Sequence, residues 1–425
     1  MGSKIGRILI VIIVLVFLSI VFREIFEMYM VSKSNYQNSI SKQEAANLEN
    51  ESSYEVKEKE IAKDEIIKNI EQENEIIEDT NIKINVIGDV MCHNSQYFDA
   101  YDSSTKEYDF SYAFDDIKEA TADADLFIGN LETTFAGKER GYSNYPKFNS
   151  PEHLAYDLKE LGIDILTTAN NHCMDTGYSG LESTLNYLDD AEILHTGTNR
   201  SIEEQNTILV KEINGFKIAF LSFTYGTNGI SIPKDKSYAV NLIDEEFILS
   251  QIKLAQAQSV DLICASMHWG IEYQTVQNEE QERLADFLIK NGVGIILGSH
   301  PHVLQPMEIR KVTLDNGEIK KGFVIYSLGN FMSGQTQKGT RTSIILNLDI
   351  RKSGKNSEIF IDNISFIPIY TYKGTGNKKY KIINIERAIE KNESGEDKSI
   401  GENNYNLLKN EFNRVEELLK YTQHN

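Results

Sequence analysis

The chain has 425 residues, 40% of them hydrophobic, 10% aromatic and 25% charged, which predicts a globular protein with enough core for one large domain or two small ones. Its 64 acidic and 43 basic side chains give a formal charge of -21, which excludes nucleic acid as a partner because a polyphosphate would be repelled at long range. An anionic substrate held by a bound dication is not excluded, because the ion is then the largest charge in the site.

An apolar run occupies residues 8–22 near the N-terminus, with a single serine in it and Arg7 and Arg23 on its flanks. A helix of this run spans about 22 Å, short of the roughly 30 Å hydrocarbon core, and snorkelling of the two arginines makes up part of the difference. A cleaved signal peptide is the alternative, but no small-x-small cleavage site follows the run. We predict an uncleaved transmembrane signal anchor over residues 8–23, with residues 1–7 in the cytoplasm and the remainder outside the cell.

Two polar segments flank the part of the chain that has a globular pattern. Residues 24–80 are predicted to be an acidic stalk, since 13 Asp and Glu stand against 5 Lys and Arg between Tyr36 and Thr80. A partner-binding coiled segment is the alternative, although the heptad pattern is not sustained. Residues 373–425 are predicted to be a polar tail that ends in an amphipathic helix around Leu407 to Tyr421.

Between these segments, short apolar runs alternate with helical patterns, and we predict one α/β domain over residues 81–372. Strand, helix and strand in repetition predict right-handed crossovers and buried parallel strands. Two later apolar runs, residues 343–350 and 358–370, have no helix between them, so we expect them to be antiparallel and to complete a second sheet. The earlier expected strands are 82–87, 125–128, 163–168, 217–223, 262–267, 294–297 and 323–327, and the expected helices are 179–190, 245–256 and 279–291.

Polar residues gather where the predicted strands end, and five of the eight histidines in the chain are among them. Ligands of α/β sheets bind beyond the carboxyl ends of the strands, so these side chains are expected to converge. Carboxylates, amide oxygens and neutral imidazoles suit divalent ions of intermediate hardness, which predicts a site for zinc, manganese or iron. The residues are Asp89, His93, Asn130, Glu132, Asn171, His172, His268, His300 and His302.

Each of these residues alone has a plainer explanation. Gly88-Asp89 is an ordinary strand-end turn, Asn170-Asn171 is another, and His268 is compatible with a packed core histidine. The ordered series of five strand-end clusters favours a metal or anion site over these explanations.

The three cysteines are too few for a disulfide framework. Cys92 and Cys173 each follow a proposed site segment, so pairing or metal binding is an alternative for them. We expect them to be small buried hydrophobic residues, and we place Cys264 in an apolar strand of the core.

The strand-end segments resemble the successive motifs of the CapA family of capsule (poly-γ-glutamate) biosynthesis proteins, in order over roughly residues 82 to 335. The resemblance implies a metallophosphatase-like fold, a four-layer α/β/β/α sandwich similar to the calcineurin-like metallophosphoesterases, in a membrane-anchored protein. Each motif is weak by itself, but the series is specific. The segments are Gly88-Asp89-Val90-Met91, Gly129-Asn130-Leu131-Glu132, Asn170-Asn171-His172, His268-Trp269-Gly270, Gly298-Ser299-His300-Pro301-His302 and Ser327-Leu328-Gly329-Asn330-Phe331.

The resemblance also implies roles for single residues. His172, with Asn171 beside it, matches the catalytic histidine that protonates a leaving group or stabilises the transition state. Asn171, His268 and His300 match the ligands of one metal position, and Asp89 and His302 match ligands of the superfamily's metal site as well.

Two departures from the superfamily pattern concern the second metal. Met91 stands where histidine is expected, and Asn130 stands at the metal-ligand position where an aspartate bridges two ions. A neutral amide is a poor bridge between two dications. Glu132 and His93 lie close enough in sequence to supply substitute ligands, and the site is predicted to be complete for one metal and impaired for two.

Three hypotheses for the function follow from the anchor, the motifs and the departures. The first is a membrane-anchored capsule polymer biosynthesis or export protein that acts with other membrane subunits and an anionic polymer. The second is an extracytoplasmic metal-dependent hydrolase that acts on phosphoesters or on amide links of polymer or cell wall. The third is a binding module that has kept the fold and lost the chemistry, for which Met91 and Asn130 are the supporting features.

Overall fold

The computed structural model describes residues 28, 30 and 78–420. The chain divides into a unit of residues 1–76 and a compact unit of residues 77–425. The anchor predicted over residues 8–23 lies outside the described residues, as does nearly all of the predicted stalk. None of the described helices is both long and apolar enough to cross a lipid bilayer.

The first of two large sheets contains eight strands, namely β1 (Thr80–Val90), β4 (Leu126–Leu131), β5 (Ile165–Thr167), β6 (Leu194–Thr196), β13 (Asn330–Met332), β14 (Thr342–Lys352), β15 (Ile359–Lys373) and β16 (Tyr380–Asn384). Their order is β16-β15-β14-β1-β4-β5-β6, with β13 paired to β1 beside this path. Strands β1, β4, β5 and β6 run parallel to one another, whereas β14, β15 and β16 are each antiparallel to their neighbours. The register pairs Asp89 with Asn130, so two predicted site residues are neighbours across the sheet.

The second sheet contains six strands, namely β7 (Leu209–Ile213), β8 (Phe216–Thr224), β9 (Leu262–His268), β10 (Ile295–Ser299), β11 (Met307–Thr313) and β12 (Ile319–Ile325). Their order is β11-β12-β10-β9-β8-β7. The four central strands are parallel, and the edge strands β7 and β11 are antiparallel to their neighbours. A separate two-stranded ribbon joins β2 (Tyr101–Asp102) and β3 (Glu107–Tyr108).

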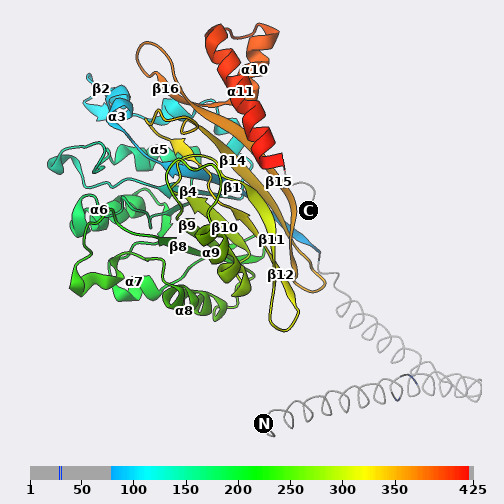
Figure 1. The fold of residues 1–425 in the computed structure, drawn as a ribbon. Coiled ribbons are helices and arrows are strands. Elements are labelled where there is room, and N and C mark those ends of the chain that lie inside the picture. The colour runs from blue at the N-terminus through cyan, green and yellow to red at the C-terminus, as the bar shows by residue number, and fades with distance from the viewer. Residues whose placement is uncertain (1–27, 29, 31–77, 421–425) are drawn as a thin grey trace, which may run out of the picture. The chain divides into compact units, whose positions relative to one another are not determined.

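Most of the helices lie in the connections between consecutive strands (Figure 1). The α-helices are α3 (Asn94–Ala100), α4 (Lys118–Thr121), α5 (His153–Leu161), α6 (Gly177–Asp190), α7 (Ile202–Asn206), α8 (Glu245–Gln256), α9 (Glu279–Lys290), α10 (Ile385–Ser394) and α11 (Gly401–Leu419). Short 3-10 helices occupy η1 (Ser111–Phe114), η2 (Lys138–Arg140) and η3 (Lys234–Ala239).

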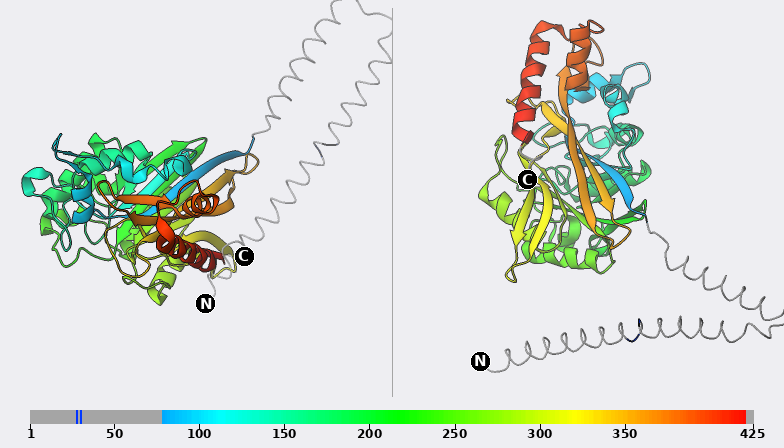
Figure 2. Two further views of the ribbon diagram at one scale, coloured as in Figure 1. Left: turned by 90° about the horizontal axis from the view of Figure 1, so that it is seen from above. Right: turned by 90° about the vertical axis from the view of Figure 1, so that its right-hand side faces the viewer.

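Successive side chains of a strand point to opposite faces of its sheet, and this alternation divides the core into layers. In β1, Ile84 points into a cluster shared with Phe220 of β8, so the two sheets pack face to face. In the same strand, Ile87 points the other way, into the cluster formed with α5 and α6. A third cluster places α8 and α9 on the outer face of the second sheet. The layer order is therefore α/β/β/α, and the mixed α/β fold predicted from the sequence is confirmed (Figures 1 and 2).

The C-terminal third differs from the prediction in two respects. Strands β14 and β15 are antiparallel as expected, but they extend the first sheet beside β1 and do not complete a second one. The reason is that the second sheet is already assembled from β7 to β12, and the open edge of β1 accepts β14. The amphipathic helix predicted near the end of the polar tail is present as α11, which buries Val415 in the core between the sheets. The edge strand β16 and the helix α10 in the same segment were not predicted.

The close approach of strands limits side-chain size at Gly298 of β10. A methyl group there would lie 1.9 Å from the carbonyl oxygen of Tyr326. We expect Gly298→Ala to lower the free energy of unfolding by about 1–3 kcal/mol, because an added methyl in a packed core forces backbone shifts. Urea unfolding measures this, with Gly226→Ala as the control, because a methyl group at Gly226 would contact nothing within 4 Å. Equal losses in the two variants would contradict the expectation.

Candidate metal centre

The predicted site residues meet where strands of both sheets end. Asp89 lies one residue before the end of β1, Glu132 follows β4 directly, and His268 is the last residue of β9. His300 and His302 follow β10. All five side chains are buried, with at most 4% of their surface exposed. The convergence arises because parallel strands of two face-to-face sheets present their carboxyl ends on one side.

Three groups of ligand atoms lie close enough to hold a metal ion, each with its atoms within 4.8 Å of one another. Glu132 belongs to two of them, one with Asp89 and His302 and the other with His268 and His300. Its Oε1 lies 3.6 Å from Nε2 of His268 and 3.8 Å from Nε2 of His302. A carboxylate shared in this way can bridge two adjacent ions. The third group contains the same two loop histidines and an exposed carboxylate, that of Glu272.

Among these residues, Glu132 has the surroundings that most clearly favour a bound cation. The side chain is fully buried, and neither carboxylate oxygen has a hydrogen-bond partner in the described part of the chain. Burial raises the pKa of Glu132 well above its usual range, and the nearby carboxylate of Asp89 raises this pKa further. An isolated buried carboxylate is costly unless it is paired or coordinates a metal. The oxygen and nitrogen donors gathered here therefore fit a divalent ion.

Asn130 performs a different task from the bridging aspartate of the superfamily. Its amide nitrogen donates to Oδ1 of Asp89 at 2.8 Å, and its Oδ1 accepts from the hydroxyl of Thr167 at 3.2 Å. The amide thus fixes one oxygen of Asp89 and leaves the other toward His302, whose Nδ1 lies 3.3 Å away. Glu132, two residues farther along the chain, is the carboxylate common to the two inner ligand groups.

His268 and His300 are held in the neutral form that binds metals. Nδ1 of His268 lies 2.9 Å from the hydroxyl of Ser299, and Nε2 lies 2.7 Å from Oδ1 of Asn171. Burial lowers the pKa of His268 well below its usual value, and His300 lowers this pKa further. Burial and then His302 lower the pKa of His300 to about 3. An imidazole that stays unprotonated at neutral pH keeps a lone pair for a metal.

The backbone of the loop after β10 is unusual at both histidines. His300 has a φ of 96° and His302 a φ of 60°, which is the left-handed region that favours glycine. Non-glycine residues in such regions cost on the order of 1–3 kcal/mol and persist where the surroundings fix them. Nδ1 of His302 contacts Oδ1 of Asn330 at 3.1 Å, and this contact helps to hold its ring in place.

His172 lies near the centre but belongs to none of the three ligand groups. Its Nδ1 lies 2.7 Å from Oδ2 of Asp175, and that oxygen also accepts the backbone N–H of Phe148 at 2.7 Å. The ring of Phe148 packs edge-on against the imidazole with centroids 4.8 Å apart. Because an ionised carboxylate only accepts hydrogen bonds, Asp175 places the proton on Nδ1 and leaves Nε2 to accept or donate a second proton.

The suggestion that His93 replaces a lost ligand stays a prediction. His93 is absent from the three ligand groups. Its Nδ1 accepts a hydrogen bond from the backbone N–H of Gly334 at 3.0 Å, and its ring packs against that of Phe148 with the two centroids 5.1 Å apart.

All three cysteines are free and buried, which fits the small hydrophobic role expected for them.

Several residues of the centre were not singled out from the sequence. Ser299 and Asn330 lie inside quoted motifs, but only the structure shows that they contact His268 and His302. Tyr225 follows β8, and its half-exposed ring lies 4.6 Å from that of His300. Residues such as Asp175 and Glu272 carried no sequence signal, because one acidic residue in a loop looks like any surface residue.

The family is settled by comparison with known proteins. Residues 83–335 match the family model for the bacterial capsule synthesis protein PGA_cap. The chain belongs to this family. The match confirms the family predicted from the motifs and covers each strand-end segment described above.

Two curated relatives share the name CapA. The chain is 27% identical over 288 residues to the capsule biosynthesis protein CapA of Bacillus anthracis, a match that covers 65% of this chain and 66% of the relative. It is 30% identical over 238 residues to the PGA biosynthesis protein CapA of Bacillus subtilis, strain 168, with 54% and 59% covered. The matched part is thus slightly under two thirds of the length of these relatives.

Among solved structures, the calcineurin-like phosphoesterase YfkN of Bacillus subtilis superposes with a TM-score of 0.40 at 15% identity, covering 68% of this chain and 90% of that one. A phosphatase of Mycoplasma pneumoniae superposes with a TM-score of 0.39 at 16% identity, covering 68% and 94%. No residue role in this chain rests on these likenesses.

Proposed function

We propose that the chain is a membrane-anchored component of capsule polymer biosynthesis or export whose domain outside the cell binds divalent metal. Family membership and the names of the two relatives support the capsule role. The apolar run of residues 8–22 supports the anchor, and the relative named for PGA biosynthesis supports an anionic poly-γ-glutamate-type polymer. Partner subunits in the membrane are part of the proposal.

One observation carries the metal-binding part of this proposal: the fully buried Glu132 carboxylate has no hydrogen bond and is shared by two ligand groups. Asp89 and His302 would hold one ion with Glu132, and His268 and His300 would hold the other. A divalent ion there supplies a Lewis acid that polarises a carbonyl or phosphoryl oxygen. Asp175 holds Nδ1 of His172, so Nε2 is the ring nitrogen that could pass a proton to a leaving group.

Hydrolysis outside the cell, of phosphoesters or of amide links in polymer or cell wall, is the second candidate. The buried His172–Asp175 pair beside the centre favours it, because the pair orients an imidazole that could act as a general acid or base. A binding module without chemistry is the remaining alternative, supported by the buried Met91 where the superfamily has a histidine.

Metal content and polymer output test this proposal together. We expect full-length wild-type protein to carry stoichiometric divalent metal by elemental analysis, and His300→Ala to lose most of it and to abolish polymer output in cells. The control is His195→Ala, because His195 lies on β6 and pairs with Asp189 away from the centre. Polymer output unchanged in His300→Ala would contradict the role of the centre, and a wild-type protein without metal would contradict the metal site.

A further inference from the structure

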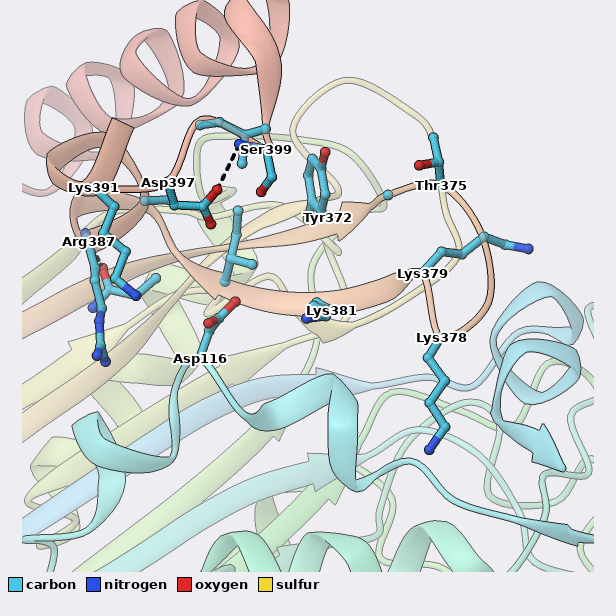
Figure 3. A pocket seen from close by; sticks show the side chains of 15 residues that line it. Asp116, Tyr372, Thr375, Lys378, Lys379, Lys381, Arg387, Lys391, Asp397 and Ser399 are labelled. Atoms are coloured by element: carbon cyan, nitrogen blue, oxygen red, sulfur yellow. Dashed lines mark hydrogen bonds between the residues drawn. The ribbon is translucent and has the colours of Figure 1, made fainter. Parts of the chain in front are cut away.

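A cavity of about 220 Å³ lies at the β16 edge of the first sheet, and no residue of the metal centre lines it (Figure 3). Its walls come from the end of β15, from β16, from α10 and from the segment between α10 and α11. Asp116, between η1 and α4, contributes from the opposite side. At roughly 30 Å³ per water molecule the volume corresponds to about seven waters, which is room for a molecule the size of an amino acid.

Cations outnumber carboxylates in the wall of this cavity, although the chain as a whole carries a charge of -21. The carboxylates are those of Asp116 and Asp397. The basic residues are Lys378, Lys379, Lys381, Arg387 and Lys391.

Two of these basic side chains lie against carboxylates that are not part of the cavity wall. Lys378 forms an ion pair with Asp109 at 2.5 Å, and Lys379 lies 3.8 Å from the buried Asp99. Figure 3 shows both side chains pointing away from the centre of the cavity. The charge that a ligand would meet therefore comes from the other three basic residues.

Arg387 and Lys391 have partners that a ligand can displace at small cost. Arg387 pairs with Glu119 at 2.9 Å, and Lys391 lies 3.8 Å from Glu396. The acidic partner is largely exposed in both pairs, with 79% and 68% of the carboxylate side chain accessible. Exposed ion pairs contribute about 0–1 kcal/mol, so exchanging one carboxylate for another costs little.

Lys381 and Asp116 are the two charged residues of the wall whose side chains form no hydrogen bond and no ion pair within residues 78–420. Lys381 is an exposed residue of β16, and its charge, after that of Lys391, helps to lower the pKa of Asp397, for which the hydrogen bonds from Ser399 have the larger effect. One free ammonium and one free carboxylate thus face the same space.

We propose that this cavity binds an acidic amino-acid residue that carries a free α-ammonium group. An unpaired cation and an unpaired anion in one cavity complement a zwitterion, and the additional cations Arg387 and Lys391 complement a second carboxylate. The ammonium group lies against Asp116, and the carboxylates lie against Lys381 and the two additional cations. Charge-assisted hydrogen bonds of this kind are about twice as strong as neutral ones.

The ligand has two sources with the same chemistry, a free acidic amino acid or the amino-terminal residue of a γ-linked glutamate chain. Either would place recognition of the monomer or of a chain end on the same domain as the metal centre. The cavity shares no residue with that centre, so we expect its ligand to bind with or without metal.

Calorimetric titration of the full-length protein with glutamate, glutarate and a short γ-linked glutamate oligomer tests this proposal. We expect glutamate or the oligomer to bind wild type and Lys381→Gln to weaken that binding by at least about tenfold, the loss of one charged contact. Asp116→Asn should weaken glutamate similarly and leave glutarate unchanged, because glutarate has no ammonium group. If the oligomer binds and its N-acetylated form does not, the source is a chain end, whereas binding of glutamate alone identifies the free amino acid.

The matched control is Lys321→Gln, because Lys321 is also an exposed strand lysine without an ion pair, but it lies on β12 of the second sheet. This variant should bind as wild type does, and so should the metal-centre variant His300→Ala. The proposal is overturned if neither glutamate nor the oligomer binds wild type, if glutarate binds as tightly as glutamate, or if Lys321→Gln weakens binding as much as Lys381→Gln. Loss of metal in His300→Ala with intact glutamate binding separates this proposal from the function proposed for the metal centre.

Discussion

Glu132→Gln is expected to bind metal at least about 100-fold more weakly than wild type, and to lose both ions where wild type holds two per chain. The change keeps the size and shape of the side chain and removes only its charge. Because Glu132 belongs to both inner ligand groups, a neutral amide there weakens both positions at once. Loss of an outer partner of a metal ligand already costs about 10–100-fold in affinity, and Glu132 is placed as a direct ligand. Elemental analysis and competition with a chelator measure the effect.

Thermal unfolding after chelator treatment shows whether Glu132→Gln acts through the metal or through folding. In the metal-free protein the wild-type carboxylate is buried without a hydrogen bond, which destabilises the fold. The glutamine variant should therefore unfold at the same or a higher temperature without metal, and only wild type should gain stability when metal is added. The control is Asp157→Asn, a carboxyl whose pKa burial raises to about 6 but which lies on α5, away from the centre. Metal content equal to wild type in Glu132→Gln would exclude the shared-ligand arrangement.

The convergence of the site was predictable because it follows from topology. Once residues such as Asp89 and His268 are placed at the carboxyl ends of buried parallel strands, the sheet brings those ends together. No distance is needed for that inference. Topology alone does not identify the shared ligand, because that depends on the directions of the side chains at the end of β4.

Asn130 and Glu132 illustrate that limit. They are two residues apart, so the alternation of a strand directs both side chains to the same side. The sequence therefore admits both as ligands and suggests that the change from aspartate to Asn130 impairs the second metal. Only the structure gives the hydrogen bond from Asn130 to Asp89, at 2.8 Å, and the two ligand groups that contain Glu132.

The position of β14 and β15 was not predictable from their pattern. An apolar run such as residues 343–350 fixes a strand and its buried face, but it does not choose between two sheets that both offer an edge. The choice was made by pairing with β1, which joins Thr80 with Lys352 and continues to Val86 with Leu346. The same holds for β16 and α10, which lie in a segment predicted as a polar tail but pack on the sheet through residues such as Ile383 and Ile385.

His172→Ala is expected to leave metal content unchanged and to reduce turnover by about 10²–10⁴-fold if the centre is hydrolytic, which is the contribution of a positioned acid or base. His172 is absent from the ligand groups, so its removal does not weaken metal binding directly. Asp175→Asn should retain metal as well and should shift the pH profile, because the amide no longer fixes the proton on Nδ1 of His172. A merely structural Asp175 would lower stability without moving that profile. Turnover on phosphodiester and γ-glutamyl amide substrates is the measurement, with His195→Ala as the control. If His172→Ala keeps full polymer output while His300→Ala abolishes it, the metal supports the structure or its partners and the hydrolytic candidate is wrong.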